Sequence, residues 1–173
     1  VKNAVGATTI SQFDYSNDAL GRRTSVKNSG TAFAPVGPQF NLYEYNDRSE
    51  LTNAVRYFGA DIGVTTNPVL GQAWGYQFDS IGNRSTATRN VTNTETYTAN
   101  QLNQYSQRTV PPVVPVLGTA ETNATVTVNN APVTRQDHYW FKELGVTNSS
   151  SSVYQPVSVV GVYNPPGTND PDV

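Results

Sequence analysis

A ten-residue phrase of aromatic, Asx and glycine residues recurs in order along the first two-thirds of this chain. The clearest copies are residues 15–24, 43–52 and 76–85, and a worn fourth copy covers residues 97–105. Recurrence of one phrase indicates recurrence of one supersecondary unit, so it constrains the fold before any other feature does. Repeats of this kind build scaffolds and shells and rarely carry chemistry themselves.

Each copy has the pattern of a β-hairpin. Alternating aromatic residues direct one face of a short strand toward a core. An Asx residue follows, whose side chain can bond its own backbone, and Gly or Ser then supplies the positive φ of the turn. A second strand returns. The repeat-defining residues are Tyr15, Asp18, Gly21, Arg22, Tyr43, Tyr45, Asn46, Tyr76, Phe78, Asp79, Gly82 and Arg84.

The rest of the chain has a different rhythm. Residues 110–116 are rich in Pro, which cannot donate to a sheet ladder, and are expected to form a linker or an edge strand. Residues 117–163 contain about five short strands, including a hairpin with the two-residue turn Asn129-Asn130 and a return strand over 131–135, which predicts a small β-sandwich. Residues 164–173 are polar and predict an extended tail. We predict no helix, and the fold class is all-β.

The repeats resemble the YD repeat, also called the RHS repeat, of bacterial secreted and surface proteins. The resemblance covers residues 10–109, with departures at Asn17, which replaces an aromatic residue, and at Ser49 and Glu50, which replace Gly-Arg. It implies that residues 1–109 form antiparallel hairpins in a spiralling sheet, many copies of which close into a shell. Residues 117–130 also resemble a short Ig-like insert of large bacterial secreted proteins.

Composition excludes several classes of function. The 173 residues carry a net charge of −2, and only 14% of them are charged. Phosphate binding needs clustered Lys and Arg, so this balance argues against nucleic acid as a partner. No apolar run is long enough to span a bilayer. The chain has no Cys, which excludes disulfides, thiolate metal sites and a Cys nucleophile.

No set of residues indicates catalysis. His138 is the only histidine, and it lies in an aromatic strand without the partners of a hydrolase triad. A zinc site needs Cys or His ligands, and no Gly-rich loop has the spacing of a phosphate-binding motif. We therefore expect no catalytic residues, no metal site and no cofactor, and we predict that the chain is not an enzyme.

The aromatic residues have two interpretations. Trp74 and Trp140, with Tyr76 and Tyr139 beside them, could form a platform for a sugar ring, although their alternation with polar residues favours core packing. Four glycosylation sequons begin at Asn83, Asn90, Asn123 and Asn148; a chain so rich in Asn, Ser and Thr contains about this many by chance.

The expected function follows mainly from the open edges of the predicted sheet. About four repeats are too few to close a shell, and unpaired strand edges are templates for another chain. We expect an extracellular or cell-surface structural protein whose partners are itself, in a homo-oligomer or fibre, or the flanking repeats of a larger chain. Val1 is not an initiator Met, which suggests a removed leader or a fragment. The alternative is a carbohydrate- or receptor-binding module that uses exposed aromatic residues.

Overall fold

A computed structural model describes residues 1–90, 92–147 and 151–163 of the chain. The fold is all-β and antiparallel, as the sequence predicts. The chain divides into two compact units, which we call the repeat unit (Val1–Pro111) and the C-terminal unit (Pro112–Val173). The division lies inside the Pro-rich stretch over residues 110–116.

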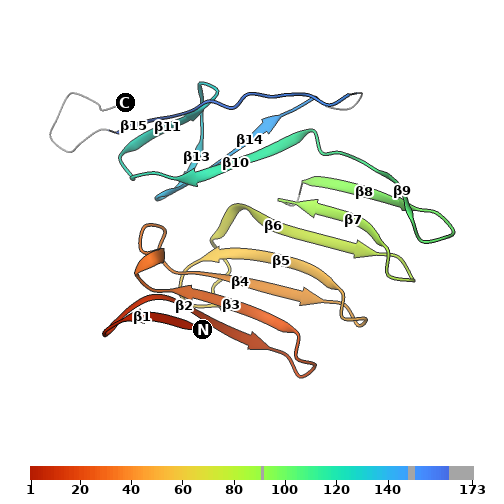
Figure 1. The fold of residues 1–173 in the computed structure, drawn as a ribbon, viewed down its shortest axis with the longest axis horizontal. Coiled ribbons are helices and arrows are strands. Elements are labelled where there is room, and N and C mark those ends of the chain that lie inside the picture. The colour runs from red at the N-terminus through yellow and green to blue at the C-terminus, as the bar shows by residue number, and fades with distance from the viewer. Residues whose placement is uncertain (91, 148–150, 164–173) are drawn as a thin grey trace. The chain divides into compact units, whose positions relative to one another are not determined.

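The repeat unit is one nine-stranded sheet in which every strand pairs with its neighbours in the sequence (Figure 1). Such a meander needs only short connections, because consecutive antiparallel strands are joined by turns. One three-residue 3₁₀ turn, Thr31–Phe33, lies between the third and fourth strands. The strands are β1 (Lys2–Val5), β2 (Thr8–Asn17), β3 (Arg23–Ser29), β4 (Gln39–Tyr45), β5 (Leu51–Phe58), β6 (Pro68–Phe78), β7 (Arg84–Arg89), β8 (Asn93–Ala99) and β9 (Tyr105–Arg108).

All four copies of the phrase form hairpins, including the worn fourth copy. They are the pairs β2–β3, β4–β5, β6–β7 and β8–β9. The register shifts at a bulge just before each turn, between Ser16 and Asn17 in the first hairpin and between Glu44 and Tyr45 in the second. Equivalent bulges occur in the other two hairpins. Because a bulge bends a strand and increases its twist, the repeat includes a fixed bend as well as a turn.

The expectation that the repeat aromatics enter a core is wrong for the repeat unit. The aromatics of the phrase are half-buried on the sheet, and Tyr15 is 43% exposed. A core needs a second layer packed on the sheet, and the described residues of the repeat unit form one layer. Among these residues, the buried hydrophobic ones are Val26, Phe40, Ala54 and Val69.

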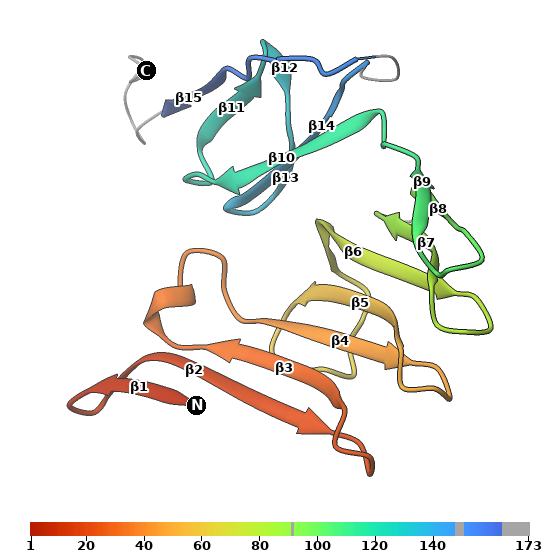
Figure 2. The ribbon, with the colours of Figure 1, turned by 45° about the vertical axis from the view of Figure 1, so that its right-hand side comes forward.

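The C-terminal unit contains two three-stranded sheets (Figure 2). Its core draws on both sheets: Val126 and Val128 come from one and Trp140 from the other, with Val116 and Leu144 packed against them. This arrangement is the small sandwich that the sequence predicts. In order, the first sheet is β10 (Val113–Thr119), β14 (Tyr139–Gly145) and β13 (Thr134–Gln136), and the second is β12 (Ala131–Pro132), β11 (Ala124–Val128) and β15 (Val159–Tyr163).

The hairpin predicted at Asn129-Asn130 is present, but its return strand is split. Both residues have positive φ, 47° and 61°, and Val128 pairs with Ala131 across the two-residue turn. The single strand predicted over 131–135 is wrong, because β12 pairs with β11 whereas β13 pairs with β14 in the other sheet. The chain changes sheets at Val133, which packs against the core. Residues 113–116, part of the stretch predicted as a linker or an edge strand, form the first half of β10, which lies at the edge of its sheet.

Candidate functional site

The turn of each repeat has the same hydrogen bonds. One oxygen of the leading Asx side chain accepts from the backbone N–H groups two and four residues later, at distances of 2.8–3.0 Å. The residue three positions after the Asx has positive φ in all four turns: Gly21 at 79°, Ser49 at 64°, Gly82 at 94° and Asn103 at 60°. Gly tolerates this conformation without strain, and Asn tolerates it better than Ser. The leading residues are Asp18, Asn46, Asp79 and Asn100.

Successive turns are joined to one another in a series that we call the turn ladder. Arg22 donates to the Asn46 carbonyl oxygen at 3.1 Å. Arg48 donates to the Asp79 and Ser80 carbonyl oxygens, each at 2.5 Å. The Asn83 amide donates to the Asn103 side-chain oxygen at 3.4 Å. These bonds connect residues 20 to 32 positions apart, so they tie the repeats together at one end of the sheet.

The carboxylates of the first and third turns are held in their charged form. The Asn83 amide and the backbone N–H groups of the turn lower the pKa of Asp79 below its usual range. For Asp18, partial desolvation pushes the pKa upward, but the hydrogen bonds from Arg22 outweigh it and the net pKa is lowered. Arg22 also forms an ion pair with Asp18 at 2.6 Å. These carboxylates are therefore structural acceptors that stabilise the turns.

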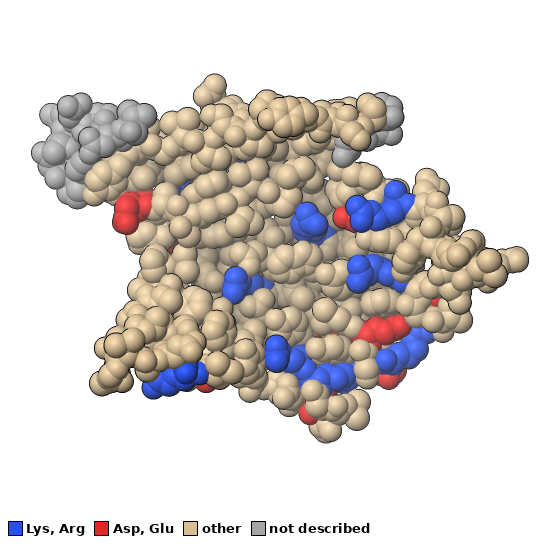
Figure 3. All heavy atoms as spheres, in the orientation of Figure 1, with Lys and Arg blue, Asp and Glu red and all other residues tan. Residues whose placement is uncertain are grey.

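One face of the sheet carries several arginine and aromatic side chains of the repeat unit. Figure 3 shows Lys and Arg side chains spread over the face in view. Residues opposite each other in neighbouring strands share a face. By this criterion Trp74 shares its face with Tyr43 and Arg89, and Tyr97 shares its face with Arg108. We call this surface the arginine–aromatic face. It contains Tyr15, Arg23, Tyr43, Arg56, Trp74, Tyr76, Arg84, Arg89, Tyr97 and Arg108.

Guanidinium groups stack on the rings of this face. The guanidinium carbon of Arg23 lies 4.1 Å from the centre of the Tyr15 ring. Burial raises the pKa of the Tyr43 hydroxyl, and the nearby charges of Arg23 and Arg56 act in the opposite direction. Positive charge therefore follows the aromatic residues across several strands.

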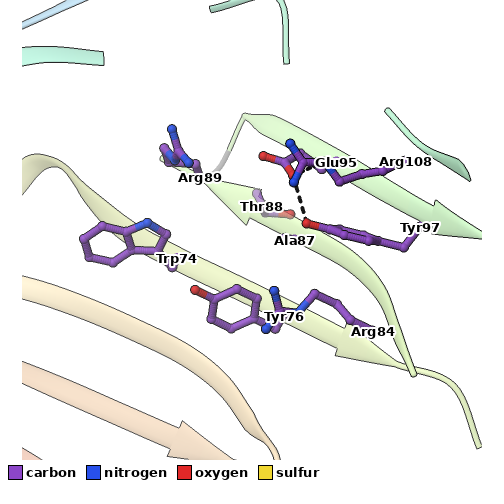
Figure 4. A pocket seen from close by; sticks show the side chains of 9 residues that line it. All are labelled: Trp74, Tyr76, Arg84, Ala87, Thr88, Arg89, Glu95, Tyr97 and Arg108. Atoms are coloured by element: carbon purple, nitrogen blue, oxygen red, sulfur yellow. Dashed lines mark hydrogen bonds and ion pairs between the residues drawn. The ribbon is translucent and has the colours of Figure 1, made fainter. Parts of the chain in front are cut away.

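The face is hollowed at its β6–β9 end, in a depression of about 260 Å³ that we call the arginine pocket (Figure 4). Trp74 and Tyr76 come from β6, and Arg84 and Arg89 lie at the two ends of β7. The strands β8 and β9 contribute Glu95, Tyr97 and Arg108. The pocket is the strongest candidate binding site of the repeat unit because it combines concavity, charge and aromatic surface.

The pair of tryptophans proposed as a sugar platform is not supported. Trp140 is 6% exposed and Tyr139 is 5% exposed, and Trp140 belongs to the core of the C-terminal unit. A buried ring cannot pack on a sugar, so the platform interpretation for Trp140 is corrected. Trp74 and Tyr76, in contrast, line the arginine pocket.

The sequons lie in different settings. The Asn83 amide is used inside its own turn, where it donates to the Asp79 carboxylate at 2.9 Å. Asn90 has positive φ, 53°, just after β7, and Asn123 lies half-buried before β11. Asn148 lies outside the described residues. The glycosylation of these positions therefore stays a prediction, and at Asn83 it would compete with the turn.

The remaining chemistry is sparse. His138 is half-buried in the turn before β14, not in the aromatic strand, and lies 3.9 Å from the exposed Glu121 carboxylate. Within residues 1–90, 92–147 and 151–163, no three His, Asp or Glu side chains come together as metal ligands would. The same part of the chain contains no helix long and apolar enough to cross a membrane.

No family model matches the chain, and no curated protein matches its sequence.

The sequence pattern does not reveal the arginine pocket. Arg84 is a repeat residue, but Arg89 and Arg108 belong to no motif. Alternation with period two, applied from Trp74 to Tyr76 and from Glu95 to Tyr97, places these pairs on one face of their strands. The pairing register that brings the arginines beside them follows from the bulges and loop lengths, which the pattern does not reveal.

Proposed function

We propose that this chain is a non-enzymatic, extracellular structural protein that self-associates through the exposed edge strands of its sheets. The observation that carries the proposal is the turn ladder, in which each turn is bonded to the turn of the next repeat. A ladder of this kind has no internal limit, because the same bonds and the same strand pairing can be formed with another repeat. The partner is either a second copy of the chain or the flanking repeats of a longer YD-repeat protein.

The strands at the ends of the sheets support this proposal. Among the described residues, β1 and β9 of the repeat unit each pair on one side only, and in the C-terminal unit the same holds for β10, β13, β12 and β15. The end strands of the C-terminal unit carry exposed apolar residues, with Val114 at 47% and Leu117 at 45% on β10 and Val159 at 48% on β15. Exposed apolar edge strands with unpaired N–H and C=O groups are sites of strand addition.

Two forms of assembly follow from this proposal. Head-to-tail pairing that does not close produces a fibre, whereas pairing with flanking repeats makes the chain one segment of a shell. We expect sedimentation velocity to show concentration-dependent self-association, and electron microscopy to show fibres, if the first form holds. Discrete monomers at high concentration would contradict the fibre form.

Edge variants identify the surface involved. Charged residues on an edge strand block pairing in natural sheets, so Val114→Lys and Val159→Lys should abolish self-association. Val153→Lys is the matched control, because Val153 is 45% exposed but lies outside any strand. Equal loss of assembly in all three variants would indicate a general charge effect and would count against pairing through the edges.

The segment form has its own test. Two copies of the repeat unit joined in tandem should unfold cooperatively and at a higher temperature than one copy, because each added repeat contributes an interface as well as its own stability. Independent unfolding of the two copies would contradict the segment form.

A further inference from the structure

The arginine pocket has more positive charge than its own residues neutralise. Three arginines line it, and Glu95 is its only acidic residue. The Glu95 carboxylate accepts from the Tyr97 hydroxyl at 2.9 Å and lies 3.6 Å from Nε of Arg108. Neither Arg84 nor Arg89 forms an ion pair with any residue that the structure describes. The pocket thus carries surplus positive charge on a chain whose net charge is −2.

Arg84 is preorganised for an acceptor. Its guanidinium carbon lies 4.5 Å from the centre of the Tyr76 ring and 6.0 Å from that of Tyr97. Its Nε is buried and has no hydrogen-bond partner among the described residues. A buried donor without a partner is costly, and a guanidinium stacked on an aromatic ring keeps its planar fork available for a carboxylate.

The pocket also has the size and surface for a single ring. Its volume of about 260 Å³ lies just below the range of roughly 300–1,000 Å³ of pockets that hold drug-sized ligands. Trp74, Tyr76 and Tyr97 are half-buried and line one pocket from two strands (Figure 4). An aromatic wall beside charged donors suits a ligand with an apolar face and an anionic substituent.

We propose that the arginine pocket binds the carboxylated sugar ring of an acidic polysaccharide, a hexuronate. The ring packs on Trp74 and Tyr76, and the carboxylate accepts the paired N–H groups of Arg84 or Arg89. Arg56 and Arg23 continue on the same face beyond Trp74, so a polymer crossing the sheet meets further charges. A nucleic acid is disfavoured because its affinity comes from many phosphate contacts, and this chain is acidic overall.

The test compares one oligosaccharide with and without its charge. Isothermal titration calorimetry with the full chain uses hexagalacturonate and its fully methyl-esterified form, which keeps the rings and removes the carboxylates. We expect binding of the acid form only, and weaker binding as NaCl rises from about 50 mM to about 500 mM, because salt screens exposed charges. Equal binding of both forms, or no binding of the acid form, would overturn the proposal.

Variants locate the site. Arg89→Gln and Trp74→Ala should each weaken hexagalacturonate binding about tenfold. Arg84→Lys keeps the charge but loses the planar fork, so we expect a similar loss. Lys2→Gln is the matched control, because it removes one positive charge from the exposed strand β1, and it should bind like the parent. A variant that unfolds at the same temperature as the parent protein is folded. If Lys2→Gln lost as much hexagalacturonate affinity as the pocket variants, the assignment to this pocket would be contradicted.

Competing ligands are included in the same titrations. Oligodeoxythymidylate tests a nucleic acid, and inorganic phosphate tests an anion without a ring. Tighter binding of either than of hexagalacturonate would overturn the proposal. This inference is independent of assembly through the edges, since Val159→Lys should leave hexagalacturonate binding unchanged even if it abolishes self-association.

Discussion

Arg22 joins the first turn to the second, since its guanidinium contacts the Asp18 carboxylate and also donates to the Asn46 carbonyl oxygen. Nε lies 2.6 Å from Asp18, and Nη1 lies 3.1 Å from Asn46, which is 24 residues further along the chain. One side chain therefore supports both its own hairpin and the contact between hairpins. Arg48 connects the second turn to the third in the same way.

Removing this connection should destabilise the repeat unit. Arg22→Gln loses the ion pair and the bond to Asn46, and we expect a cost of about 1 kcal/mol in urea unfolding, because both partners are partly exposed to solvent. Arg23→Gln is the control in the same hairpin, where only stacking on exposed Tyr15 is lost, and should cost at most about 0.5 kcal/mol. A larger effect of Arg23→Gln would contradict the role given to the ladder.

Substitutions at the positive-φ residue of the turn should change the free energy of unfolding in opposite directions at Gly21 and at Ser49. Gly21 has φ of 79°, and a Cβ there would meet nothing within 4 Å, so Gly21→Ala tests backbone strain alone. We expect it to lower the free energy of unfolding by about 1 kcal/mol. Ser49 has φ of 64°, and its hydroxyl accepts a long hydrogen bond from Arg22 at 3.3 Å. Ser49→Gly relieves the backbone and loses this bond, so it should raise the free energy of unfolding by less than about 1 kcal/mol. Chemical unfolding of both variants tests this prediction. A change of the same sign in the free energy of unfolding for both variants would contradict the shared turn conformation.

Acid should weaken the turns. The pKa of Asp79 is lowered in the folded chain, so its carboxylate stabilises the fold above the ordinary aspartate pKa of about 3.9, and this contribution is lost as pH falls through the folded pKa. We expect Tm to decline between about pH 5 and about pH 2. Asp79→Asn keeps the accepting oxygen, as Asn46 does naturally, and should show a shallower decline. Parallel curves for the parent and the variant would contradict this assignment.

Gly118 should be irreplaceable in the C-terminal unit. It pairs with Trp140 across β10 and β14, and a Cβ there would lie 2.6 Å from Cζ2 of the indole. Because Trp140 is buried, Gly118→Ala must displace core packing, at a cost of roughly 1–3 kcal/mol. Gly145→Ala is the matched control on the partner strand, since a Cβ there meets nothing within 4 Å.

The measurement for Gly118 uses tryptophan fluorescence. The chain has two Trp residues, so Trp74→Phe as background leaves Trp140 as the reporter of the C-terminal unit. Urea unfolding should shift to lower concentration for Gly118→Ala and stay near the background value for Gly145→Ala. Equal shifts would indicate an effect of strand glycines in general rather than the contact with Trp140.

Turn formation was predictable because its determinants are close in sequence. The Asx side chain bonds N–H groups two and four residues away, and the positive φ falls three residues after it, as at Asp18 and Gly21. The worn copy follows the same rule at Asn100 and Asn103. Alternation of apolar and polar residues likewise predicts strands, and the Asn129-Asn130 pair predicts a two-residue turn. Both signals depend only on neighbouring residues.

Other predictions failed where the outcome depends on distant residues. Alternating aromatics predict one buried face, but burial requires a second layer, and the repeat unit does not supply one. Trp140 could be read as an exposed platform because its sequence neighbours do not reveal that Val126 and Val128 cover it from the other sheet. The return strand over 131–135 splits for a similar reason, since two different sheets compete for its halves.

The sequence by itself determined the hairpins, the Asx turns and the all-β class, because each rests on bonds or sterics within a few residues. Only the tertiary structure decided what the repeats do together. The turn ladder joins residues 20 to 32 positions apart, and the arginine pocket collects Trp74, Arg89 and Arg108 from three strands. These contacts depend on strand register, which is set by bulges and cross-strand packing over the whole sheet and not by any local phrase.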